Sequence, residues 1–156
     1  MSVAWSAPVP FAASVPAAPF RAYVLHLLEA SEVPWRVLAQ EAGVPAAALR
    51  TLVTGRDGAF RPRLDRTIAQ RLLAVTPGRL RSLHAATVPS TRAQQRIAEL
   101  RRRGLDGPAI GRLLGVDADT LRRIEEGFQS TCSLLVDARA RAAVTALREA
   151  GGWGER

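Results

Sequence analysis

The sequence predicts an all-α fold made of two tandem small helix-turn-helix domains, and three observations support this prediction. The stretch 35–54 has the pattern of two short helices joined at Gly43, where a residue without Cβ lets the chain reverse sharply. Leu49 and Leu52 are three residues apart, so they share the inward face of the second helix. A similar pattern returns at 107–126. Hydrophobic residues make up 47% of the chain but aromatic residues only 5%, so aliphatic side chains must fill the cores.

The second pattern stands in fixed register with the first. Gly115 follows Gly43 by 72 residues, and residues of the same class recur at this offset on both sides of the glycine. We therefore interpret the chain as two copies of one small helical unit. The matching pairs are Leu25 with Ile97, Leu28 with Leu100, Leu38 with Ile110, Ala39 with Gly111, Val44 with Val116, Leu49 with Leu121, Arg50 with Arg122, Leu52 with Ile124 and Gly55 with Gly127.

Composition shifts divide the chain into five segments. Residues 1–18 are a low-complexity arm of Ala, Pro, Ser and Val, for which we expect no fixed structure. Residues 19–78 form the first predicted domain and residues 90–150 the second. Between them, 79–89 is a connector whose apolar residues allow a short helix, and 151–156 is a glycine-rich tail that we expect to be flexible.

The charge balance indicates a polyanionic partner. The chain has 22 basic residues, all of them Arg, against 14 acidic residues, which gives a net charge of +8 and a pI of about 11.5. The codons of a high-GC genome favour Arg over Lys, but this bias does not explain why basic residues outnumber acidic residues. A basic balance of this kind favours nucleic acid without distinguishing DNA from RNA or an anionic membrane.

The exposed face of the second helix in each domain carries the candidate base-reading residues. In a helix-turn-helix these positions point into the major groove of double-stranded DNA. Arg50 has the geometry to bind guanine through two hydrogen bonds, alanines can contact thymine methyl groups, and Asp119 can accept from a cytosine amine. The candidates are Ala46, Ala47, Arg50, Thr51 and Thr54 in the first domain and Ala118, Asp119, Arg122 and Arg123 in the second.

An alternative remains open for the second domain. Asp119, Glu125 and Glu126 are spaced to form ion pairs with Arg122 and Arg123 on the same helix. In that case these acids form ion pairs with the arginines that would otherwise contact DNA.

A second set of arginines lies where phosphate contacts are expected if the reading helices dock on DNA. For the arginines that follow the first reading helix, the alternative to phosphate contact is that they lie in a loop exposed to solvent. The run 101–103 ends a predicted helix, where cations also suit the helix dipole. The candidate phosphate-binding residues are Arg36, Arg56, Arg61, Arg63, Arg66 and Arg112.

The residue types that carry catalysis are sparse. His26 and His84 have no acid at a useful spacing, and Cys132 has no neighbouring His or Lys. There is no glycine-rich phosphate loop and no cluster of metal ligands in the sequence, so we expect no enzyme activity, cofactor or bound metal. A single cysteine and an N-terminal segment interrupted by proline predict a cytoplasmic protein, associated with the nucleoid if it binds DNA, with no membrane partner.

Three segments resemble a known family. V-L-A-Q-E-A-G-V-P-A-A-A-L-R-T-L-V-T-G, I-A-Q-R-L-L-A-V-T-P and I-A-E-L-R-R-R-G-L-D-G-P-A-I-G-R-L-L-G-V-D-A-D-T-L resemble tandem helix-turn-helix DNA-binding regulators of actinobacteria and actinobacteriophages. The likeness covers about residues 20–150 and implies a regulatory DNA-binding protein, with phage immunity repressors among comparable two-domain architectures. Pro45 departs from the usual Ser or Thr cap, and the acids of the second reading helix depart from a basic one.

Together these features predict a sequence-specific double-stranded DNA-binding protein that regulates transcription, as a repressor rather than an activator, with two recognition helices. A monomer would bind an asymmetric site, and a homodimer a pseudo-palindromic one. Two alternatives remain. One is an interaction module in which one unit binds DNA and the second domain binds a protein partner. The other is a non-specific nucleoid-associated protein.

Overall fold

The computed structural model describes residues 13–151, and it is mostly helical, as the sequence predicted. Four strands of three residues each accompany the helices in this range. In chain order the elements are β1 (Ser14–Pro16), α1 (Ala18–Ser31), α2 (Trp35–Ala42), α3 (Ala46–Thr54), β2 (Arg63–Asp65), α4 (Arg66–Leu73), α5 (Pro77–Ala85), β3 (Thr87–Pro89), α6 (Thr91–Arg102), α7 (Gly107–Leu114), α8 (Ala118–Glu125), β4 (Thr131–Ser133) and α9 (Leu134–Gly151).

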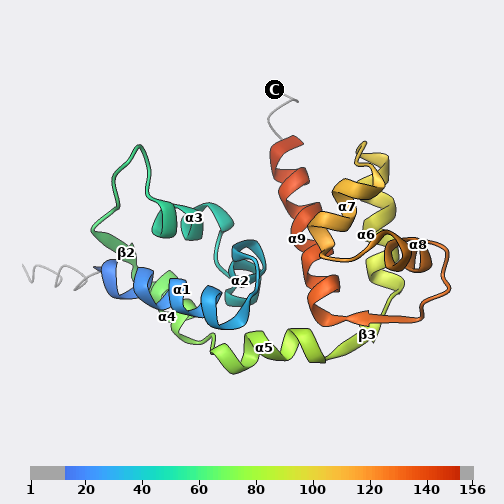
Figure 1. The fold of residues 1–156 in the computed structure, drawn as a ribbon. Coiled ribbons are helices and arrows are strands. Elements are labelled where there is room, and N and C mark those ends of the chain that lie inside the picture. Colours follow the sequence, from blue (N-terminus) through green and yellow to red (C-terminus); the bar gives the residue numbers. More distant parts are fainter. Residues whose placement is uncertain (1–12, 152–156) are drawn as a thin grey trace, which may run out of the picture.

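The same order of elements, one strand, three helices, one strand and one helix, runs from β1 to α4 and from β3 to α9 (Figure 1). In each half the two strands pair antiparallel, with Val15 opposite Leu64 in the first and Val88 opposite Cys132 in the second. Each strand pair therefore brings the start of a half next to its last helix. We call residues 13–73 the first half and residues 87–151 the second half, with α5 between them.

Glycine ends the second helix of each half for the same reason. Gly43 after α2 and Gly115 after α7 have φ values of 68° and 69°, a left-handed conformation that residues with a Cβ rarely adopt. An arginine from the last helix of each half reaches this turn. Arg71 donates from Nη1 to the Gly43 carbonyl at 2.7 Å, and a Cβ on Gly115 would lie 2.7 Å from Nη1 of Arg139.

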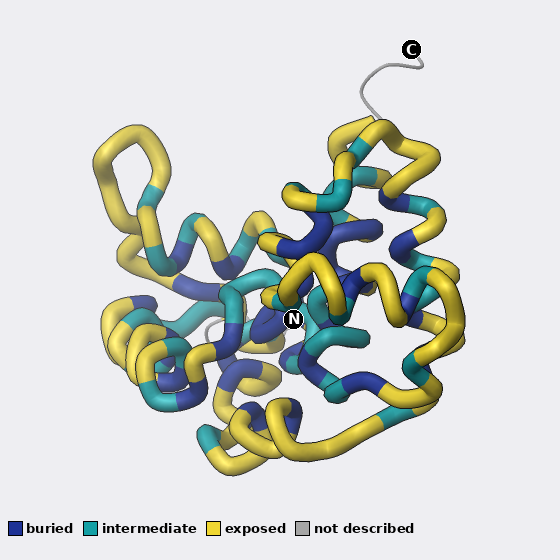
Figure 2. Tube along the Cα trace, turned by 45° about the vertical axis from the view of Figure 1, so that its right-hand side comes forward, coloured by how far each residue is buried: buried dark blue, intermediate teal, exposed yellow. Residues whose placement is uncertain are grey.

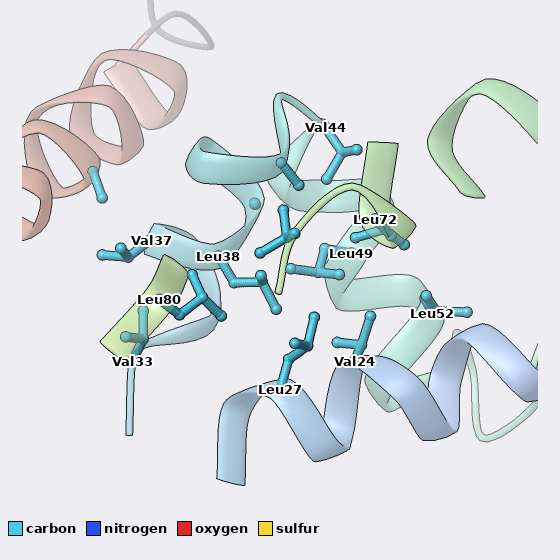
Figure 3. Packing of buried hydrophobic residues seen from close by; sticks show 14 of the residues in the cluster. Val24, Leu27, Val33, Val37, Leu38, Val44, Leu49, Leu52, Leu72 and Leu80 are labelled. Carbon is cyan, nitrogen blue, oxygen red and sulfur yellow. The ribbon is translucent and has the colours of Figure 1, made fainter. Parts of the chain in front are cut away.

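The apolar side chains form two clusters, and both include residues of α9. Leu27, Leu38, Leu49 and Leu72 lie at the centre of the cluster of the first half (Figure 3). Ile97, Leu100, Ile110, Leu114, Leu121 and Ile124 form the centre of the cluster of the second half.

The α9 helix has two apolar faces. Leu135, Ala138 and Ala142 are spaced at three and four residues and pack into the first cluster. Ala140, Ala143 and Val144 pack into the second. Figure 1 shows α9 standing between α2 on one side and α6 and α7 on the other. The α9 helix therefore contributes side chains to both apolar clusters and joins the two halves.

Two segments outside the predicted domains contain secondary structure, and for one of them this differs from the sequence-based expectation. The expectation of no fixed structure for residues 1–18 is wrong for residues 14–18, because 14–16 form β1 and Ala17 is buried. The rest of that arm up to residue 12 lies outside the described residues, as do residues 152–156 of the expected tail. The connector 79–89 is not free, since it lies in α5, which packs on α1 and α9, and in β3.

The residue pairing that was predicted between α1 and α6 needs one correction. Leu25 was paired with Ile97, but Leu25 is 47% exposed and Ile97 is fully buried. Val24 and Leu27 are the inward residues of α1, so the equivalence with Ile97 and Leu100 holds at an offset of 73 residues. One extra residue between α1 and α2 accounts for the change from 73 to 72.

Within residues 13–151, no helix has both the length and the apolar character needed to cross a membrane.

We predict that damage to α9 destabilises both halves together. Ala138 is 5% exposed and packs in the first cluster, so Ala138→Asp places an uncompensated carboxylate there. We expect a loss of more than about 2 kcal/mol in unfolding free energy. Ala98→Asp, at an exposed position of α6, is the matched control and should change stability little. Thermal unfolding followed by circular dichroism checks this, and two separate transitions in the wild type would contradict it.

Candidate nucleic-acid interface

The candidate interface in the first half is built on the outward side of α3. Leu49 and Leu52 point into the core, which leaves a ridge of exposed residues one helical turn apart on the opposite side. Ala47, Arg50 and Thr54 form this ridge, and the Thr54 hydroxyl donates to the Arg50 carbonyl at 2.8 Å. The ridge is short, since nine residues of helix span about 14 Å.

Two of the predicted base-reading residues lie deeper than expected. Ala46 is half-buried and packs against the first apolar cluster, so it contributes little free surface. Thr51 is also half-buried, although it lines hollows on both flanks of α3.

On one flank of α3 lies a hollow of about 520 Å³, which we call the Trp35 hollow. Trp35 begins α2, and the Arg36 guanidinium lies 4.6 Å from the centre of its ring. Arg50 and Arg56 line the same hollow. Glu149, from the end of α9, also lines it and places one carboxylate beside these arginines.

On the other flank lies a second hollow of about 270 Å³, which we call the Arg61 hollow. Arg61 and Arg63 line it together with Asp65 and the ridge residue Ala47. Arg63 is already engaged, because it donates from Nε to the Ser14 hydroxyl at 3.1 Å and from Nη2 to the Ser14 carbonyl at 2.7 Å. Its contacts thus support the β1–β2 pair, which sequence reasoning did not foresee.

The other arginines of this surface keep their guanidinium groups available. Within residues 13–151, the side chains of Arg50, Arg56 and Arg61 form no hydrogen bond to protein and no salt bridge. Arg66, at the start of α4, is also exposed. The surface around α3 therefore presents guanidinium groups that form no salt bridge within residues 13–151, although carboxylates of Asp57, Asp65 and Glu149 line the same hollows.

The corresponding face of α8 is different, because its charges pair with one another. Arg122 lies 2.8 Å from Asp119 and 3.5 Å from Glu126 on the same helix. The hydrogen bond that Arg122 donates to Asp119 and the charge of Glu126 raise the pKa of Arg122. The alternative in which acids occupy the arginines is thus confirmed for Arg122. Arg123 is exposed, and it has no salt-bridge partner in the described part of the chain.

Glu125 forms a long-range pair instead of the helical one expected. It accepts from Nε of Arg101 at 2.8 Å and from Nη2 at 3.1 Å, and Arg101 comes from α6. Arg103 lies 3.3 Å from Glu99, which also binds Arg148 of α9 at 2.8 Å. The hydrogen bond from Arg148 is the main cause of the lowered pKa of Glu99. Two residues of the 101–103 run therefore bind acids of the protein.

The two helices also differ at their first turns. Asp117 precedes α8 and accepts from the Thr120 amide at 2.7 Å, and this backbone hydrogen bond is the main cause of its lowered pKa. Pro45 precedes α3 and provides no side-chain cap. A carboxylate at the start of α8 repels phosphate, whereas the first turn of α3 keeps backbone N–H groups without a capping side chain.

A third hollow lies between α7 and α8 in the second half. It measures about 640 Å³ and is lined by Gly111, Val116 and Leu121 with Arg112 and Ala118 at its edge. The equivalent place in the first half, between α2 and α3, is bordered by Ala142, Thr145 and Ala146 of α9. The lining residues of the hollow of the second half come from α6, α7, α8 and the turn between α7 and α8. Arg112 and Ala118 are thus exposed, as predicted, but beside an apolar surface.

Three residues of the α3 surface escaped the sequence analysis as site residues. Trp35 begins α2, and Glu149 and Arg21 come from the distant helices α9 and α1. Arg21 donates from Nε to the Leu52 carbonyl at 2.8 Å and its guanidinium lies 4.0 Å from the centre of the Phe60 ring. Only the fold brings these residues to α3, since no local pattern marks them.

The side chains of His84 and Cys132 contact other parts of the protein and are not part of the α3 surface. His84 lies 2.8 Å from the Ser31 carbonyl through Nε2, and burial raises the pKa of the Cys132 thiol. Among the described residues, no group of three or more His, Cys, Asp or Glu is placed to hold a metal ion.

Comparison with known proteins found no matching family model, no matching curated protein and no matching solved structure.

We predict that the Asp117 cap makes the second half sensitive to acid. Because the folded pKa of Asp117 is lowered, its contribution to stability is present above the unfolded pKa of about 4 and is lost as the pH falls through the folded pKa. Asp117→Asn keeps a capping side chain but cannot titrate. Urea unfolding between pH 6 and pH 2.5 should show the stability difference between wild type and variant shrinking as the pH falls. A difference that grows on acidification would contradict this.

Proposed function

We propose that this protein binds double-stranded DNA, with α2 and α3 acting as a helix-turn-helix and α3 lying in the major groove. One observation carries the proposal. The outward ridge of α3 forms part of the wall of the Trp35 hollow, with the Arg61 hollow beside it, and the guanidinium groups of Arg50, Arg56 and Arg61 have no hydrogen-bonding or salt-bridge partner within residues 13–151.

The roles of the individual residues follow from their positions. Arg50, at the middle of the ridge, reads a guanine edge, and Ala47 and Thr54 contact neighbouring bases. The arginines in or beside the two hollows bind phosphates on either side of the groove and set the orientation of α3. We assign this second role to Arg36 and Arg66, while Arg56 and Arg61 add positive charge at the edge of the same surface.

We propose further that the second half is a copy of the same unit with a lesser share in base reading. The shared order of elements supports the common origin of the two halves. The ion pairs of Arg122 and the acidic cap of α8 support a weaker interaction of the second half with DNA. In this proposal Arg123 and Arg112 make most of the contacts of the second half with DNA. The likeness to tandem helix-turn-helix regulators is consistent with a transcriptional regulator, and we propose repression as its action.

We expect Arg50→Ala to relax base preference at one position of the site and to weaken binding by about 1–3 kcal/mol. Selection from randomised duplexes followed by fluorescence anisotropy checks this. Arg122→Ala, which removes an arginine already paired on α8, is the matched control and should cost much less. An equal loss on all sequences after Arg50→Ala would exclude Arg50 as a base reader, and a wild type that binds no duplex would overturn the proposal.

We expect Glu149→Gln to tighten DNA binding about two- to fivefold, with the larger effect at low salt. Glu149 lines the Trp35 hollow beside Arg50 and Arg56, so its carboxylate repels phosphate there. Glu29→Gln removes an exposed carboxylate from α1 that lines none of the hollows, and it serves as the control. Anisotropy titrations at 50 and 200 mM salt measure both, and an equal gain in the two variants would show a general charge effect.

A second candidate function is favoured by the hollow between α7 and α8. Its lining is largely apolar, and the equivalent place in the first half is bordered by small residues of α9. A partner protein that offers a helix face of small residues fits such a surface. In this version the first half binds DNA and the second recruits the partner.

A further inference from the structure

The connection between α3 and β2 contains a tight β-hairpin in place of the open loop that its composition suggested. The Arg56 amide donates to the Ala59 carbonyl at 2.8 Å, and the Ala59 amide donates to the Arg56 carbonyl at 3.0 Å. Asp57 and Gly58 between them have φ values of 53° and 78°. Two central residues with positive φ are typical of a type I′ turn, the form that suits two-residue hairpins. We call residues 56–59 the hairpin.

The hairpin is braced at its base. Gly55 has a φ of 76°, and a Cβ there would lie 2.8 Å from the Ala59 carbonyl oxygen, so the two ends of the hairpin are in close contact. The Phe60 ring lies under the guanidinium of Arg21 at 4.0 Å. Arg21 is itself bonded to the Leu52 carbonyl at 2.8 Å, which ties the hairpin to the end of α3. The hairpin is therefore preorganised relative to α3.

The second half shows that the fold closes without this hairpin. Gly127, after α8, is followed directly by Phe128, whereas Gly55 is separated from Phe60 by the four residues of the hairpin. The strands β2 and β4 then follow at the same distance from each phenylalanine. The hairpin is an addition to the first half alone, so the packing of the core does not explain it.

The hairpin is placed to extend the α3 surface. Figure 1 shows the connection from α3 to β2 rising beyond α3, away from the body of the first half, and Figure 2 shows it exposed along most of its length. Arg56 on one arm lines the Trp35 hollow, and Arg61 just after the hairpin lines the Arg61 hollow. An arginine thus lies on either side of a narrow turn whose two central residues are Asp57, which carries a carboxylate, and Gly58, which has no side chain.

A helix that occupies a major groove has a minor groove next to it, about 6 Å wide in B-form DNA. A slender two-residue turn fits this width better than a helix does, and arginine is favoured in narrow, A·T-rich minor grooves, where the negative potential is strongest. We propose that the hairpin enters the minor groove adjacent to the major groove held by α3, and that Arg56 and Arg61 select A·T-rich flanks there. This inference rests on the proposed function of α3.

The test uses the full chain and duplexes obtained by selection, with the flank of the α3 site made of G·C, A·T or inosine·cytosine pairs. Inosine lacks the guanine amine in the minor groove but keeps the major-groove edge of guanine, so it isolates minor-groove reading. We expect wild type to bind the A·T and inosine·cytosine flanks about five- to tenfold more tightly than the G·C flank.

Two variants remove the hairpin contacts. Deletion of residues 56–59 recreates the short connection of the second half, and the double variant Arg56→Ala/Arg61→Ala keeps the hairpin backbone. Both should lose the flank preference while they keep the base preference that depends on Arg50. Arg81→Ala, an exposed arginine of α5 outside both hollows, is the control for loss of charge and should keep the flank preference.

The outcomes separate the inference from the function on which it rests. Equal wild-type affinity for all three flanks, or a loss in the variants that is the same on each flank, would mean phosphate contact only and would overturn the minor-groove proposal while leaving α3 as a reader. Failure of wild type to bind any selected duplex, or no effect of Arg50→Ala, would overturn the proposed function itself. If the deletion does not fold, as judged by its melting curve, the double variant alone decides.

Discussion

The structure depends on one helix that is buried on two sides. Small and aliphatic residues on one face of α9 point into the core of the first half and those on another face into the core of the second, so neither core is complete without this helix. A helix with a single apolar face would have left the halves joined only by α5 and its flanking residues. Because α9 is packed on both sides, the halves are held in a set orientation, and its last turn brings Glu149 to the edge of the α3 surface.

The two halves share a backbone plan but differ in electrostatics. On α8 the acids are near enough to Arg122 to pair with it, and α6 supplies Arg101 to the remaining glutamate. On α3 the neighbouring positions are alanine, threonine and valine, so Arg50 has no acid within reach on its own helix. Exposed pairs of this kind add little stability, but they lower the net charge that a polyanion meets. The surface of α3 therefore suits DNA better than that of α8.

Preorganisation links the fold to the proposed activity. The hairpin, the two hollows and the ridge of α3 are held by contacts that involve Arg21, Arg63 and Arg71, each of which donates to a backbone carbonyl. These arginines stabilise the backbone around α3, while the guanidinium groups of Arg50, Arg56 and Arg61 form no hydrogen bond or salt bridge within the described range 13–151. A surface that is already ordered loses less conformational entropy when it binds, so more of the contact energy appears as affinity.

The sequence by itself determined the local structure. The apolar stripes and the glycine turns act over a few residues, and they predicted a mostly helical chain and the positions of α2, α3, α7 and α8. Tertiary structure decided what depends on distant contacts. It paired residues 14–16 with 63–65, turned Val24 rather than Leu25 inward, engaged Arg63 with Ser14, and drew Glu125 to Arg101. Tertiary structure also placed α9 between the two cores. The sequence shows that this helix is apolar on two faces, but which helices pack on each face depends on contacts with distant parts of the chain.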